Sequence, residues 1–182
     1  MSWNPRRTMK IAGELYNAGH ITYMRTDSTR TNQGARDDVK SHIGETWGED
    51  HLGKGVLGPD AKSDASNVQD AHEAIRPTRP KIKSPAGLST EQSRLYNLIW
   101  ARFAGSQMNS SRYERLSMSA QADGFNRIFS GSASWRVHRG WEAAYEGIRK
   151  EPATTPPSFD ASAGTVLSLD EVEDDGENPC LR

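Results

Sequence analysis

Apolar residues recur at intervals of three and four along three stretches of the first 110 residues, which is the spacing of one face of an α-helix. The stretches run from Asn4 or Pro5 to Gly19, from about Gln33 to Trp47, and from Ser89 or Thr90 to about Met108. Proline favours the first turn of a helix and glycine follows the last turn. We therefore expect three helices. The residues expected on their apolar faces are Met9, Ala12, Leu15 and Tyr16, then Val39, Ile43 and Trp47, then Leu95, Leu98, Ile99, Trp100, Phe103 and Met108.

The period changes to two residues from Tyr113 onward. Leu116, Met118 and Ala120 alternate with serines, as in a half-buried strand. A second strand is expected over residues 126–134, interrupted by Gly131, and a further alternating run covers residues 165–172. The pattern predicts an α+β protein with a mostly helical domain in residues 1–112 and a partial antiparallel β section in residues 113–182.

Two further segments are dominated by polar and charged residues. Residues 49–67 are rich in Gly, Asp, Ser and Lys, and we expect a surface loop there. Residues 170–177 are acidic, and Asp174 and Asp175 offer two readings: a metal site or a solvated charge run. The solvated run is the interpretation we adopt, because charge runs near a chain end are usually surface.

Composition excludes several classes of protein. The single cysteine, Cys180, cannot form an internal disulfide, and no cysteine cluster indicates zinc. No apolar run reaches the length of a membrane span, and Arg6 and Arg7 are not followed by the apolar run of a signal peptide. We expect a soluble cytoplasmic protein without a membrane partner.

The net charge of −1 conceals an asymmetry along the chain. Up to Tyr113 there are 16 Lys or Arg and 12 Asp or Glu, and from Glu114 there are 7 and 12. The first part therefore carries +4 and the second −5. A basic surface is the sign expected for nucleic-acid binding, so the helical part is the candidate for it.

The stretch Ile-Thr-Tyr-Met-Arg-Thr-Asp-Ser-Thr at residues 21–29 combines a phenol, a guanidinium and a carboxylate. Tyr23 and Arg25 are two residues apart, so in an extended segment their side chains leave the same face. A phenol can attack phosphorus, and a guanidinium can hold the phosphate oxygens. A tyrosine in such a segment can also be a strand residue packed by its ring, and from this stretch alone both readings stand.

A second polar stretch, Gln-Asp-Ala-His-Glu-Ala-Ile-Arg-Pro-Thr, occupies residues 69–78. The prolines that follow forbid a long helix there. A lone histidine such as His72 is more often structural than catalytic. Arg76 either anchors a backbone phosphate or organises the loop through carbonyl groups.

The two stretches together closely resemble the type IA DNA topoisomerases. The resemblance is carried by Tyr-Met-Arg-Thr-Asp-Ser from Tyr23 and by Ala-His-Glu-Ala-Ile-Arg-Pro around His72. It implies that Tyr23 becomes linked to the 5′-phosphate of single-stranded DNA, with Arg25 and His72 as its catalytic partners. The implied DNA-binding residues are Arg25, Asp27, His72 and Arg76, and Asp27 would orient Arg25 rather than act as a base. The resemblance also implies a CAP-like helix-turn-helix domain, part of a strand-rich arch, and a nucleoid-associated enzyme.

In that family a separate N-terminal domain carries a catalytic glutamate and the acidic cluster that binds Mg²⁺. The present sequence has no strand followed by Glu-Gly and no Asp-x-Asp-x-Glu, so no metal ligands are identified in it. The resemblance thus implies that the complete enzyme needs Mg²⁺ and that this domain is a missing partner. We expect the chain alone to be inactive. The alternative is a non-catalytic nucleic-acid-binding module with a helix-turn-helix-like fold, whereas the residue patterns of relaxases and tyrosine recombinases are not present.

Overall fold

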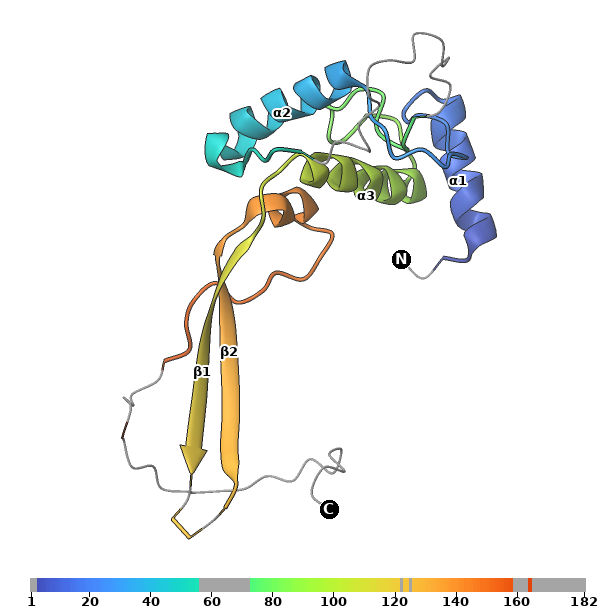
Figure 1. Cartoon of the computed structure of the whole chain (residues 1–182). Helices are drawn as coiled ribbons and strands as arrows, with labels where there is room; N and C mark the ends of the chain where they lie inside the picture. The colour runs from blue at the N-terminus through green and yellow to red at the C-terminus, as the bar shows by residue number, and fades with distance from the viewer. Residues whose placement is uncertain (1–2, 56–72, 122, 125, 159–163, 165–182) are drawn as a thin grey trace.

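The structure, a computed structural model, describes residues 3–55, 73–121, 123–124, 126–158 and 164. It contains helices α1 (Pro5–Asn17), α2 (Gln33–Trp47) and α3 (Thr90–Ser106), and the short 3-10 helices η1 (Glu49–His51) and η2 (Gly140–Tyr145). Strands β1 (Arg112–Gln121) and β2 (Ile128–His138) form one antiparallel pair. The α+β prediction is confirmed. The helices gather at one end of the molecule, and the β1–β2 hairpin extends away from them (Figure 1).

The three expected helices form where their capping residues place them. Side chains of Asn4 and Asn32 accept hydrogen bonds from the first turns of α1 and α2. Ser89 and Gln92 form a reciprocal capping box at the start of α3. Gly48, with φ of +94°, ends α2 as expected. These local signals act over four residues, so the sequence alone locates the helix starts.

The helices share a core centred on Trp100, whose ring is fully buried and whose Nε1 donates to the carbonyl of Pro80 at 2.7 Å. One face differs from expectation. Met9 and Tyr16 on α1 are 39% and 40% exposed, whereas Ile11 is buried beside Leu15. The buried stripe of α1 is therefore centred on Ile11 and Leu15, which leaves Tyr16 at the surface.

The hairpin is longer and more regular than its sequence indicates. Gly131 does not interrupt β2: it pairs with Met118 in an unbroken stretch of the ladder, and the strand continues past the expected end at Ser134 to His138. Gly131 lies in ordinary extended backbone with no atom near its missing side chain. The two strands have no third partner among the described residues, and only Leu116 and Met118 on β1 are partly buried.

The chain returns from the hairpin to the helices through an element that the sequence analysis missed. Gly140 turns the backbone with φ of +48°, and η2 then buries Ala143, Ala144 and Tyr145 in the same core as α3. The expected division of the chain at residues 112 and 113 stays a prediction.

The loop predicted over residues 49–67 is only partly described. Its first residues form η1, and Leu52 makes an antiparallel bridge with Met108, so this part is packed rather than free. Residues 56–67 and the expected run at residues 165–172 lie outside the described residues. Across the described ranges, no helix is long and apolar enough to cross a membrane.

Candidate active site

The two polar stretches singled out in the sequence lie side by side. Ile21 and Pro77 form an antiparallel bridge. The N–H of Thr22 donates to the carbonyl of Arg76 at 2.9 Å, and the N–H of Arg76 donates to Oγ1 of Thr22 at 2.9 Å. The Thr22 hydroxyl donates in turn to the carbonyl of Ala74 at 2.8 Å. Segments more than 50 residues apart are thus joined immediately before Tyr23.

Exposure alternates along the segment that follows. Tyr23, Arg25 and Asp27 are exposed, whereas Met24 and Thr26 between them are partly buried. Met24 packs against the helical core. Tyr23, Arg25 and Asp27 are thus all open to solvent, and their grouping on one face, which the two-residue spacing predicts, stays a prediction.

The ring of Tyr23 is supported on one side only. It meets the ring of Tyr16 edge to face, with centroids 5.2 Å apart and an interplanar angle of 66°. Tyr23 nevertheless remains 47% exposed, and its hydroxyl makes no hydrogen bond with any described residue. The ring-packing reading and the nucleophile reading are therefore compatible: the contact with Tyr16 positions the ring, and the side chain stays accessible.

Arg25 and Asp27 stand beside Tyr23 without fixed partners. Neither side chain has a hydrogen bond or ion pair with a residue that the structure describes. The expected orientation of Arg25 by Asp27 thus has no contact here. Thr26 and Ser28 serve the local backbone instead, because their hydroxyls accept from the N–H groups of Ser28 and Arg30 at 3.0 and 3.2 Å.

The backbone of Arg76 is hydrogen-bonded to Thr22, and its side chain contacts the residues on either side of it in the loop. Its Nε and Nη2 donate to the two carboxylate oxygens of Glu73 at 2.5 and 2.9 Å, and its Nη1 donates to the carbonyl of Pro77 at 2.8 Å. Glu73 also accepts from the N–H of Asn32, the capping residue of α2, at 2.6 Å. These contacts belong to the loop-organising reading of Arg76, and contact with a phosphate stays a prediction. His72 lies outside the described residues.

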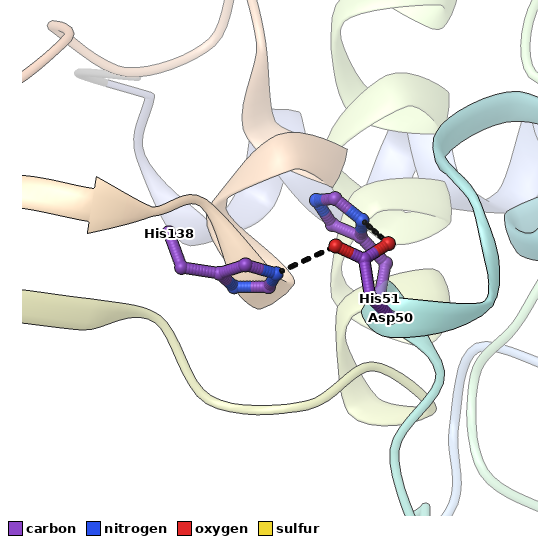
Figure 2. Close-up of side chains that lie close together, drawn as sticks. All are labelled: Asp50, His51 and His138. Carbon is purple, nitrogen blue, oxygen red and sulfur yellow. Dashed lines mark hydrogen bonds and ion pairs between the residues drawn. The ribbon is translucent and has the colours of Figure 1, made fainter.

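A second polar cluster, which the sequence analysis missed, lies where the hairpin meets the helices (Figure 2). Asp50 and His51 come from η1, and His138 comes from the end of β2. Hydrogen bonds from His51 and then His138 hold the pKa of the Asp50 carboxyl below its usual value. No motif spacing reveals this cluster, because its members come from a short 3-10 helix and a strand end far along the chain.

The residues present do not fit Mg²⁺. That ion prefers carboxylate and water oxygens in octahedral geometry. Within the described part of the chain, the one group with metal-ligand spacing has two imidazoles and a single carboxylate. In the described segments on either side of the Thr22–Arg76 contact, the Glu73 carboxylate is already bonded to Arg76 and Asn32, and Asp27 adds one further carboxylate.

Comparisons with known proteins all match DNA topoisomerases. A family model described as DNA topoisomerase matches residues 1–177. DNA topoisomerase 1 of Salmonella typhimurium is 34% identical over 175 residues, and that of Thermotoga maritima is 35% identical over 184. These alignments cover 93% and 95% of this chain but 19% and 29% of the relatives. The solved structure of full-length topoisomerase I from Thermotoga maritima matches with a TM-score of 0.68 at 30% identity, over 89% of this chain and 26% of that one.

Proposed function

The chain belongs to the type IA DNA topoisomerase family, and on this basis we propose that it carries the tyrosine that breaks and rejoins single-stranded DNA. The observation that carries the proposal is the exposed side chain of Tyr23, which lies two residues before the exposed Arg25 and directly follows Thr22, the residue hydrogen-bonded to Arg76. The chain spans 19% and 29% of the length of the Salmonella typhimurium and Thermotoga maritima relatives, so the reaction of a complete enzyme is part of the proposal.

The proposed step is a transesterification. The phenolic oxygen of Tyr23 attacks a backbone phosphorus, the bond from phosphorus to the 3′ oxygen breaks, and a 5′-phosphotyrosine and a free 3′-hydroxyl result. The phenol loses its proton and the 3′ oxygen gains one. Because one phosphoester replaces another, rejoining the strand is the reverse step and needs no ATP.

Arg25 neutralises the phosphate as charge builds on its oxygens in the transition state. Its side chain is exposed and free of protein partners among the described residues, so it is available to an anion. His72 lies next in sequence to Glu73 and donates to the phosphate or assists proton transfer to the leaving oxygen. Asp27 and Arg76 border the bound strand.

The proposal includes partners that this chain does not supply. A phenol is mostly protonated at neutral pH, and the described residues around Tyr23 include no evident base. In the complete enzyme an N-terminal domain provides the catalytic glutamate and binds Mg²⁺. We therefore propose that the 182-residue chain alone neither cleaves oligonucleotides nor relaxes supercoiled DNA. We further propose that the helices form a CAP-like helix-turn-helix domain and that the hairpin belongs to the strand-rich arch of the complete enzyme. We also propose that the enzyme associates with the nucleoid.

The test is complementation. The chain is mixed with a separately produced N-terminal Mg²⁺-binding domain of a bacterial relative and with a 3′-labelled single-stranded oligonucleotide, because the label then stays with the 5′-phosphotyrosine. A covalent adduct is scored on a denaturing gel. We expect adduct only in the mixture with Mg²⁺, and none with Tyr23→Phe.

Two results would contradict this assignment. An adduct that persists in Tyr23→Phe would place the nucleophile elsewhere. Salt-sensitive DNA binding that is equal in the wild type and Tyr23→Phe, without adduct in any mixture, would support the non-catalytic binding module.

A further inference from the structure

The cluster of Asp50, His51 and His138 has no part in the proposed cleavage reaction. It joins η1, on the helical body, to the last residue of β2, at the root of the hairpin (Figure 2). Two of the five histidines of the chain thus converge on one carboxylate.

The three side chains already stand at the spacing of metal ligands. Nδ1 of His51 lies 3.1 Å from Oδ1 of Asp50, and Nε2 of His138 lies 3.3 Å from Oδ2. One donor atom from each residue lies within 4.8 Å of the others. Zinc bonds of about 2.0–2.2 Å to nitrogen and oxygen place tetrahedral ligands roughly 3.4 Å apart. His51 and His138 contact different oxygens of Asp50, so the side chains have to draw closer before one oxygen and the two nitrogens share an ion.

The surroundings favour a cation. The side chains of His51 and His138 are only 13% and 11% exposed, while that of Asp50 is 69% exposed and offers an entry path. The positive charge of the neighbouring Arg139 is balanced, because its guanidinium pairs with Glu146 and Glu151 at 3.5 and 3.4 Å, so it repels a bound cation less.

Hydrogen bonding alone explains part of this arrangement. Nδ1 of His138 accepts from the N–H of Gly140 at 3.0 Å, so in the metal-free protein Nε2 carries the proton and donates to Asp50. A metal on Nε2 requires the other tautomer and breaks the Gly140 contact.

We propose that Asp50, His51 and His138 bind a divalent transition-metal ion, with Zn²⁺ as the representative, and that water completes its coordination. Two imidazoles and one carboxylate suit such an ion and leave a position open. The site is structural, because it links the helical body to the hairpin root and lies among residues that the cleavage proposal does not use. Bound metal would therefore stabilise the junction between the hairpin and the helices.

The test is Zn²⁺ titration of the whole chain by calorimetry, in a Cys180→Ser background that removes the one thiol. Co²⁺ absorption in the visible range reports the coordination geometry. The variants are His51→Gln, His138→Gln and Asp50→Asn, with His42→Gln and His72→Gln as histidine controls. Asp50→Asn guards against misfolding because that side chain is largely exposed. DNA is absent from every sample, so the outcome is independent of the cleavage proposal.

We expect one Zn²⁺ per chain, a rise in melting temperature with Zn²⁺, and at least tenfold weaker binding in each of the three cluster variants. The two controls should bind as the wild type does. The proposal is overturned if the wild type shows no saturable binding, if the cluster variants bind as tightly as the wild type, or if His72→Gln removes the site.

Discussion

Thr22 and Arg76 hold each other through two 2.9 Å hydrogen bonds, one from the N–H of Thr22 to the carbonyl of Arg76 and one from the N–H of Arg76 to the Thr22 hydroxyl. Thr22 directly precedes Tyr23, and the Arg76 side chain is fixed by Glu73. The place of Tyr23 is therefore determined by a segment more than 50 residues away. The two polar stretches are therefore adjacent in the structure, as the proposed function requires.

Thr22→Val should destabilise the protein by about 1–3 kcal/mol. Valine keeps the shape, but the Arg76 N–H loses its acceptor and the Ala74 carbonyl loses its donor in a partly buried place. Urea unfolding followed by circular dichroism measures the change. The matched control is Thr29→Val at an exposed position of the same segment, which should change stability by less than about 0.5 kcal/mol. Equal effects at the two positions would contradict the structural role of the Thr22 hydroxyl.

Tyr23→Phe should leave folding intact while removing the covalent adduct in the complemented reaction. The hydroxyl of Tyr23 has no hydrogen bond to a described residue, and the ring contact with Tyr16 is retained by phenylalanine. We expect a change in unfolding free energy below about 0.5 kcal/mol, as for other surface substitutions. Tyr16→Phe is the control, since it also removes a surface phenol and should still allow the adduct. Strong destabilisation by Tyr23→Phe would mean that the hydroxyl serves the fold.

The sequence predicted best those features that depend on neighbouring residues. Helix starts follow from capping side chains within one turn, and the alternating exposure from Tyr23 to Asp27 agrees with the two-residue spacing of these polar side chains. The family resemblance rested on the same local stretches, and the comparisons confirmed it. Features that depend on contacts between distant segments were not predicted from the sequence.

Gly131 and η2 illustrate why. A glycine inside an alternating run suggests a break, but the cross-strand partner Met118 keeps the ladder continuous. The six residues of η2 are too few to show a helical period, and Ala143, Ala144 and Tyr145 are buried because they pack in the same core as α3. The pairing of Glu73 with Arg76, and the cluster around Asp50, likewise depend on distances that no spacing rule contains.

Gly140→Ala should destabilise the protein by roughly 2 kcal/mol or more. A Cβ at Gly140 would lie 2.5 Å from the backbone of Ser110 and Ser111, and φ of +48° disfavours any side chain. Backbone atoms cannot rotate aside as a side chain can. The control is Gly131→Ala, where no atom lies within 4 Å and the backbone is extended. It should be neutral or stabilise by up to about 1 kcal/mol. Thermal unfolding of both variants decides, and similar losses at both positions would refute the close packing at Gly140.

The stability of the protein should fall as the pH rises from about 10 to about 12, and Tyr96 should account for part of that fall. Burial raises the pKa of the Tyr96 phenol to about 12, and its hydroxyl donates to the carbonyl of Ile82 at 2.7 Å. In the unfolded chain a phenol loses its proton near pH 10, whereas the folded form keeps it, so the unfolded state is favoured as the pH increases. The contribution is fully present below pH 10 and is lost through the folded pKa, up to roughly 2 kcal/mol.

Tyr96→Phe removes this titration. It should lower stability at neutral pH by about 1 kcal/mol through the lost hydrogen bond, and it should flatten the alkaline part of the profile. Tyr16→Phe, in which an exposed phenol is removed, serves as the matched control and should keep the wild-type slope. Urea unfolding at a series of pH values from 8 upward gives both curves. If the slope of Tyr96→Phe above pH 10 equals that of the wild type, the buried phenol of Tyr96 is not the group that links folding to alkaline pH.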